Sequence, residues 1–126
     1  MKILIAFFFL TPLTFLPPPS HSGLCGIVPE KAYSQNLFGK NVGYYVRLKN
    51  NTSKKVDAVA WVAKFYNNFD DFKGEKTGKW ESGNFTSEAE PGEIFTDLES
   101  AWISGASKVY IQIKRVHFTD GSSCGN

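Results

Sequence analysis

Residues 56–66 read Val-Asp-Ala-Val-Ala-Trp-Val-Ala-Lys-Phe-Tyr, an almost continuous apolar run in the middle of a 126-residue chain. Val59, Trp61 and Phe65 fall in phase on one face of an extended strand. Alanine also favours helices, but the β-branched and aromatic residues, with turn-forming residues at both ends, favour a strand. The run therefore predicts a central strand of a β-sheet.

The residues before this run predict a second strand. Residues 42–49 alternate, so that Val46 and Leu48 share one face with other apolar side chains, while Tyr45 lies on the opposite face with basic residues. Residues 50–53, Asn-Asn-Thr-Ser, carry side chains that hydrogen-bond nearby backbone and tolerate turn dihedral angles. We therefore expect the chain to reverse direction between the two strands.

Further strand patterns occupy the rest of the chain. Residues 79–85 and 94–98 are short candidates, and residues 108–119 form a long one in which the apolar phase changes. A β-bulge near residues 114–115 would account for that change. Only residues 98–103 favour a helix, so strands are expected to dominate.

These strands favour an all-β architecture, an antiparallel sandwich of two sheets. Each sheet has an apolar face that must be covered, and the sequence offers no helices to cover it. A small closed barrel is the alternative. The side chains expected in the core are Val46, Leu48, Val59, Trp61, Ala63, Phe65, Phe95, Val109, Ile111 and Ile113.

The stretch 46–69, a strand, an Asn-Asn-Thr-Ser turn and a strand ending in Phe-Tyr-Asn, resembles the centre of FxLYD-type and related small bacterial extracytoplasmic immunoglobulin-like domains. Pro-Gly-Glu at residues 91–93 and Val-His-Phe-Thr-Asp-Gly-Ser at residues 116–122 are similar to the later turn and last strand of those domains. The resemblance covers residues 42–122. It implies an immunoglobulin-like β-sandwich outside the cytoplasm that serves as an accessory or interaction module, and it implies no activity.

The N-terminus has the features of a signal peptide. Residues 3–16 are largely apolar but include a proline and fall short of the roughly 20 residues that a membrane-spanning helix needs. The tripeptide Ser-His-Ser that ends at Ser22 supplies small residues for cleavage. We therefore expect a signal peptide at 1–22, a single β-sandwich domain at 23–126, no membrane span after cleavage, and a secreted or periplasmic protein; an uncleaved anchor is the alternative.

The chain holds two cysteines, Cys25 and Cys124, near the two ends of the expected domain. Exported proteins meet an oxidising compartment, so the pair is expected to form a disulfide. Neither cysteine belongs to a Cys-x-x-Cys motif, and the expected role of the bond is structural.

Composition and charge restrict the class of partner. Hydrophobic content of 42% with 15% aromatic residues excludes a disordered chain. The net charge of +2 is too small to neutralise a run of phosphates, so nucleic acid is not an expected partner. Asn50, Asn51 and Asn84 match the N-glycosylation pattern, which matters only in a eukaryotic source; the bacterial resemblance predicts bare sites.

The sequence contains few of the residue combinations that catalytic and metal sites need. Only His117 remains after the expected cleavage, so a histidine-based triad or a multi-histidine metal site lacks its parts. The acidic residues within 70–75 lack calcium-loop spacing, and we expect no catalytic residue, metal or cofactor. A carboxylate pair for hydrolysis stays open among Glu81, Glu88, Glu90, Glu93, Asp97 and Glu99, because their separation in space is unknown.

Four residues are candidates for binding. Trp80 and Tyr45 could stack on a sugar or a peptide, although packing under a loop is the simpler interpretation of each. Asp70 and Phe72 lie in the turn-rich segment 67–76, which could insert into the active site of an enzyme. Both phenylalanines of that segment are expected to fold back onto the edge of the core.

The expected function is therefore a non-catalytic binding or accessory module that recognises another protein or a surface polymer. One alternative is an inhibitor of a secreted hydrolase. The other alternative, from a different class, is a small carboxylate-dependent hydrolase.

Overall fold

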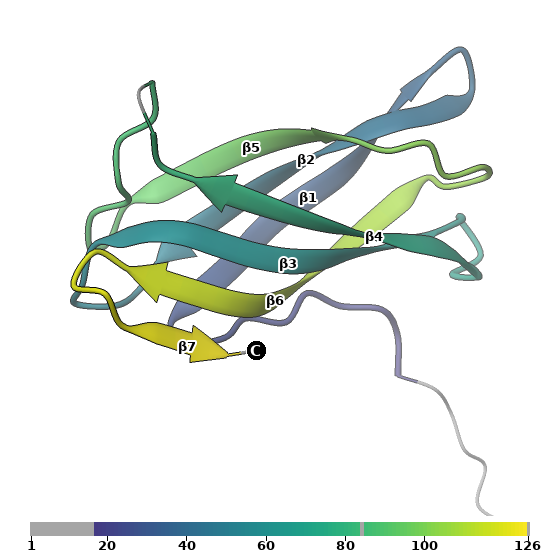
Figure 1. Ribbon diagram of the computed structural model, residues 1–126. Coiled ribbons are helices and arrows are strands. Elements are labelled where there is room, and N and C mark those ends of the chain that lie inside the picture. Colours follow the sequence, from purple (N-terminus) through teal and green to yellow (C-terminus); the bar gives the residue numbers. More distant parts are fainter. Residues whose placement is uncertain (1–16, 84, 126) are drawn as a thin grey trace, which may run out of the picture.

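The computed structural model describes residues 17–83 and 85–125 (Figure 1). Within these residues the chain is all-β, and no helix long and apolar enough to cross a membrane is present in that described part. The strands are β1 (Ile27–Leu37), β2 (Lys40–Asn50), β3 (Val56–Tyr66), β4 (Phe72–Glu81), β5 (Ile94–Ser100), β6 (Lys108–Phe118) and β7 (Ser123–Gly125).

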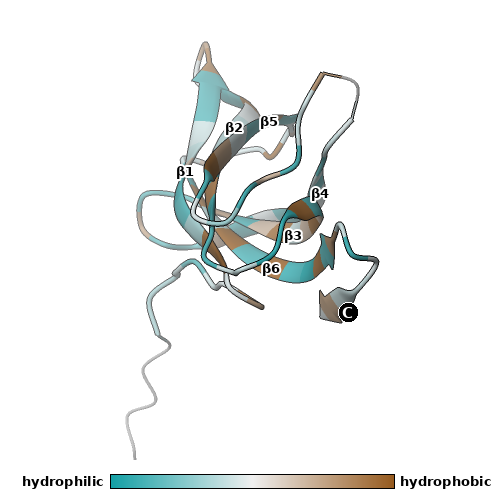
Figure 2. Ribbon diagram, turned by 90° about the vertical axis from the view of Figure 1, so that its left-hand side faces the viewer, coloured by the Kyte–Doolittle hydropathy of each residue, from teal (hydrophilic) through white to brown (hydrophobic). Residues whose placement is uncertain are grey.

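The strands form two antiparallel sheets that pack face to face. One sheet has the order β1-β2-β5 and the other the order β4-β3-β6-β7, so the chain changes sheets after β2, β4 and β5. Figure 2 shows hydrophobic segments on β2, β3 and β6, the strands inside the two sheets. The expected two-layer arrangement is confirmed.

The core lies between the sheets and contains all ten side chains expected there. The most exposed of them, Phe95, is only 8% exposed. Trp61 lies at the centre, 1% exposed, and its indole Nε1 donates a hydrogen bond of 2.8 Å to the hydroxyl of Tyr44. Gly78 on β4 makes room for this pair, because a Cβ atom there would collide with both the Trp61 ring and the Tyr44 hydroxyl.

The long β6 strand contains the expected bulge. Ala60 is paired with Arg115 and the next residue, Trp61, with Ile113, so Lys114 has no partner on β3. The extra residue shifts the alternation by one position, which keeps Val116 and Phe118 buried on the core side.

Three sequence-based expectations are wrong. Residues 98–103 form no helix, because β5 continues to Ser100. β4 begins at Phe72, within the segment expected to be a loop, and ends before the expected limit of residue 85. β1 was not expected at all: a proline and two irregularities, one between Pro29 and Lys31, interrupt its alternation.

The two ends of the domain are joined. Cys25 and Cys124 form the expected disulfide, with Cα atoms 6.3 Å apart, and connect the entry to β1 with β7. Ahead of them, the backbone of Ser22 bonds to β6: its N–H donates to Ile111 O at 2.9 Å, and its carbonyl accepts from Ile113 N at 2.9 Å. Most of the expected signal peptide, residues 1–16, lies outside the described residues. The expected cleavage would cut directly after the Ser22 contact.

The turn between β2 and β3 is built around a buried asparagine. Asn50 is 0% exposed, and its amide donates to the carbonyls of Lys54 and Ala89 at 2.9 and 3.0 Å. Its Oδ1 accepts from the backbone N–H and the hydroxyl of Thr52 at 2.9 and 2.6 Å. With every polar atom satisfied in the interior, Asn50 is not available for glycosylation in the folded protein; Asn51 is exposed, and Asn84 lies outside the described residues.

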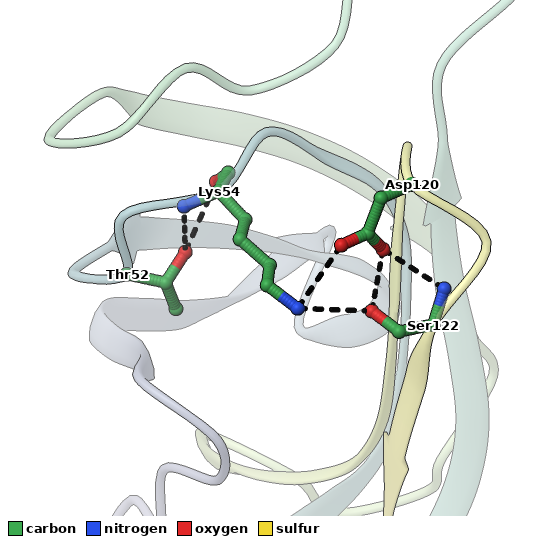
Figure 3. Close-up of polar contacts among 4 residues, drawn as sticks. All are labelled: Thr52, Lys54, Asp120 and Ser122. Atoms are coloured by element: carbon green, nitrogen blue, oxygen red, sulfur yellow. Dashed lines mark hydrogen bonds and ion pairs between the residues drawn. The ribbon is translucent and has the colours of Figure 1, made fainter.

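A polar clasp ties this turn to the turn between β6 and β7 (Figure 3). Lys54 Nζ lies 3.0 Å from Asp120 Oδ2 and donates to Ser122 Oγ at 3.2 Å. Hydrogen bonds from the hydroxyl and the backbone N–H of Ser122 hold the pKa of Asp120 well below its ordinary value, and Lys54 makes a smaller contribution in the same direction. The clasp lies at the end of the sandwich that carries β7.

Candidate functional site

Three connections meet at the other end of the sandwich. They are the β1–β2 turn (residues 38–39), the β3–β4 loop (residues 67–71) and the β5–β6 loop (residues 101–107), which reach the right-hand end in Figure 1. We call this set of loops, with the flanking residues Leu37 and Phe72, the loop end.

The loop end exposes five large apolar side chains. Phe38 is 94%, Phe69 87% and Trp102 71% exposed, and each comes from a different connection. Leu37 and Phe72, at the adjoining strand termini, are 56% and 55% exposed. Isolated exposed apolar residues are common on protein surfaces, whereas several at one end are the kind of feature found at interaction sites, so the loop end is the candidate site.

Hydrogen bonds between the loops hold them together. Ile103 N donates to Asn41 Oδ1 at 3.2 Å, which joins the β5–β6 loop to the start of β2. Ser107 Oγ donates to Asn68 Oδ1 at 2.9 Å, which joins the β5–β6 and β3–β4 loops. An ion pair of 2.9 Å between Lys108 and Asp70 strengthens the second connection. The apolar side chains therefore project from a fixed base.

The β3–β4 loop is also ordered from within. Asn67 Oδ1 accepts from the backbone N–H of Phe69 and of Asp71, both at 2.9 Å, which is the pattern of an Asx turn. Asp70 has a φ of 64°, in the left-handed region that aspartate tolerates better than most residues. This geometry turns the Phe69 side chain outward.

The structure separates the four binding candidates. Asp70 and Phe72 lie at the loop end, whereas Tyr45 lies on the outer face of the three-stranded sheet. Trp80 is wrong as a surface candidate: it is 5% exposed and packs against Phe95 with ring centroids 4.5 Å apart. Phe72 does contact the core edge through Tyr66, but Phe69 does not fold back as expected.

The acidic side chains of the β3–β4 loop are bound to their own neighbours. Asp70 pairs with Lys108, and Asp71 accepts a hydrogen bond of 3.1 Å from the amide of Asn67. In the described part of the chain, no group of three or more histidine, cysteine or acidic side chains is placed to hold a metal ion.

A second cluster lies on the inner face of β5. Asp97 and Glu99 are two residues apart on one strand and follow the buried Phe95 on the same face. Glu99 lies opposite Tyr44 in the β2–β5 register. Of the six carboxylates that the sequence left open, these are the two that the structure brings together.

Burial and the neighbouring carboxyl group of Asp97 both raise the pKa of Glu99. Desolvation, followed by the hydrogen bond and the charge of Asp97, raises the pKa of Glu99 to about 7, and Lys79 opposes this shift. Burial raises the pKa of Tyr44 to about 12 against the effect of the Trp61 hydrogen bond, and Glu99 and Asp97 add to the increase. Glu99 therefore titrates near neutral pH, next to a second carboxyl group.

This pair predicts a dependence of stability on pH. Glu99 takes up its proton more readily in the folded state, so its favourable contribution is complete below its unfolded pKa of about 4.5 and is lost as the pH rises through about 7. Glu99→Gln should therefore match the wild type near pH 4 and exceed its free energy of unfolding by about 1 kcal/mol near pH 8, after allowance for solvent screening.

Urea titrations of both proteins at the two pH values measure this difference. Glu88→Gln, at an exposed carboxylate outside the pair, serves as the control and should show no such dependence on pH. An equal effect of Glu99→Gln at both pH values would contradict the raised pKa of Glu99.

Sequence reasoning missed Phe38, and it preferred Trp80 and Tyr45 to Trp102 as stacking residues. The signal for Phe38 was available: Leu-Phe-Gly at residues 37–39 places two large apolar side chains beside a glycine, directly before the alternating segment 42–49. Trp102 lay in the expected helix, so it was not considered as the tip of a loop. The exposure of both side chains depends on where the β1–β2 hairpin and the β5–β6 loop terminate in the folded protein.

Comparisons with known proteins do not add an assignment. No protein-family model, curated protein or solved structure matches the chain.

Proposed function

We propose that this protein is an extracytoplasmic binding module that docks onto another protein through the loop end. The observation that carries the proposal is the exposure of Phe38, Phe69 and Trp102 on three connections at one end of the sandwich. The β5–β6 loop among them is hydrogen-bonded to the start of β2 and to the β3–β4 loop. Aromatic side chains on a rigid scaffold supply large contact areas and lose little conformational entropy on binding.

The chemistry around the rings favours a protein over a lipid surface. Asp70 and Asp71 directly follow the exposed Phe69. Carboxylates at that position would be repelled by an anionic membrane and would lose hydration in its interior. At a protein interface they can accept hydrogen bonds from main-chain or basic groups at the rim.

The proposed location and fold family rest on separate observations. The apolar N-terminus and the Cys25–Cys124 disulfide support export to an oxidising compartment. The strand order supports an immunoglobulin-like sandwich: β1, β2 and β5 would take the places of strands A, B and E, and β3, β6 and β7 those of C, F and G, with β4 beside β3.

A triple variant tests the proposal. Phe38→Ser, Phe69→Ser and Trp102→Ser together should reduce the amount of partner that the immobilised protein retains from the medium or envelope of its own source by at least about 100-fold, because each ring is an expected hot spot. Unfolding should stay unchanged, since the three side chains are exposed.

Phe85→Ser is the matched control. Phe85 is fully exposed on the β4–β5 connection, away from the loop end, and its removal should leave retention intact. Retention of the same partner by the triple variant, or equal loss with Phe85→Ser, would refute docking through the loop end.

An inhibitor of a secreted hydrolase would be a special case of this function. The β3–β4 loop is held by the Asn67 side chain and by the Asp70–Lys108 pair, as expected of a loop that must resist an enzyme's active site. If the retained partner is a hydrolase, loss of inhibition in an Asp70→Ala, Phe72→Ala variant would establish this role.

The Asp97–Glu99 pair favours a second candidate, a small carboxylate-dependent hydrolase. The raised pKa of Glu99 leaves it able to donate a proton near neutral pH, and Asp97 supplies a second carboxyl group beside it. Glu99→Gln separates the two functions: a hydrolase loses turnover, whereas a binding module keeps its partner.

A further inference from the structure

The outer face of the three-stranded sheet carries an exposed row of apolar side chains. Tyr33 on β1 is paired with Tyr45 on β2, which is paired in turn with Leu98 on β5. The two tyrosine rings stack with centroids 4.8 Å apart at an interplanar angle of 22°. Tyr33 is 43% and Leu98 61% exposed, so this row presents ring and aliphatic surface to solvent.

A row of cations runs beside it. Lys31 is paired with Arg47, two residues from the two tyrosines along their strands, and Lys49 follows Arg47 on the same face. Lys31 Nζ lies 5.6 Å from the centre of the Tyr33 ring. None of the three cations belongs to an ion pair formed within residues 17–83 and 85–125.

The acidic residues of β5 do not neutralise this face. Asp97 and Glu99 alternate with Leu98 and lie on the opposite, inner side of the strand. The neighbours of Leu98 on the outer side, Thr96 and Ser100, are uncharged. Glu30 is exposed beside Lys31 at the irregularity of β1 and offsets part of the charge. With Lys31, Arg47 and Lys49 against this one carboxylate, the face combines a stacked aromatic row with an excess of positive charge.

We propose that this tyrosine face, formed by Lys31, Tyr33, Tyr45, Arg47, Lys49 and Leu98, binds an anionic polysaccharide. Sugar rings would lie against the tyrosines and Leu98, and the carboxylate or sulfate groups of the polymer would pair with Arg47 and Lys31. A nucleic acid fits less well, because three cations and a net charge of +2 neutralise few phosphates.

The tyrosine face is separate from the loop end. It covers the outside of the β1-β2-β5 sheet, whereas the loop end lies where the strands terminate. The inference therefore goes beyond the proposed function, and either surface can fail its test without affecting the other.

The test measures binding of the purified protein to four polymers: polygalacturonate, dextran sulfate, neutral dextran and single-stranded DNA. We expect binding to at least one anionic polymer, which identifies carboxylate or sulfate as the group recognised, and at least about tenfold weaker binding to dextran. Affinity should fall as salt rises from about 50 to about 200 mM, because ion pairs contribute.

Variants locate the surface. Arg47→Ala and Tyr33→Ser should each weaken binding by about tenfold, whereas Tyr33→Phe, which keeps the ring, should stay within about twofold of the wild type. Arg115→Ala is the matched control, because Arg115 is an exposed arginine on β6 in the other sheet. Equal urea midpoints for all variants show that folding is preserved.

Three results would overturn the inference. The first is no binding to either anionic polymer. The second is an equal loss of affinity with Arg115→Ala and with Arg47→Ala, which would indicate a diffuse charge effect. The third is tighter binding to single-stranded DNA than to both anionic polymers, which would assign the face to a nucleic acid.

Discussion

Trp61→Ala is expected to lower the free energy of unfolding by about 3–5 kcal/mol, which is much of the stability of a domain this size. Trp61 is 1% exposed and lies between the sheets against Gly78. Its removal leaves a cavity that backbone on both sides cannot easily close. It also deprives the buried Tyr44 hydroxyl of its 2.8 Å hydrogen bond.

Urea titration followed by circular dichroism measures this loss. Trp102→Ala is the matched control, because Trp102 is 71% exposed and its removal should change stability by no more than about 0.5 kcal/mol. Similar effects of the two substitutions would show that Trp61 is not at the centre of the core. Trp61→Phe, which fills part of the space, should fall between the control and Trp61→Ala.

Replacing both cysteines with alanine is expected to lower the free energy of unfolding by about 4 kcal/mol. Cys25 and Cys124 are 99 positions apart, and closing a loop of about 100 residues removes chain entropy worth up to about 4.7 kcal/mol from the unfolded state. The bond also holds β7, which has three residues and pairs only with β6. Without it, both ends of the domain are expected to fray.

Unfolding of the double variant, compared with the oxidised wild type, measures this contribution. The reduced wild type is the control for lost side-chain packing, and it should be destabilised by nearly the same amount as the Cys25→Ala, Cys124→Ala variant. A difference of less than about 1 kcal/mol between the oxidised protein and the double variant would contradict a bracing role.

The strands that could be predicted are those with one buried face and an uninterrupted alternation. Residues 42–49 and 56–66 fall within β2 and β3, and the change of phase near residues 114–115 located the bulge in β6. Burial on one face imposes a period of two on the sequence, so these segments carry their own signal.

Two edge strands, β1 and β4, lacked this regular signal. β4 has Gly74 and Gly78 where an apolar pattern would place inward side chains, because the Trp61 and Tyr44 side chains fill the space above Gly78. β1 is interrupted at Pro29 and pairs through an irregular register. Each pairs with the strand beside it in the chain, but only one of its two edges is paired, and much of its surface is exposed, so burial imposes little alternation on its sequence.

The sequence by itself determined the all-β class, the ten core side chains and the two cysteines that pair. Those features follow from local alternation and from counting residues. Only the tertiary structure decided that Trp80 is buried, that Asp97 and Glu99 lie together on the inner face of β5, and that the connections carrying Phe38, Phe69 and Trp102 lie at one end. These features depend on which strands lie opposite one another, and long-range packing sets that arrangement.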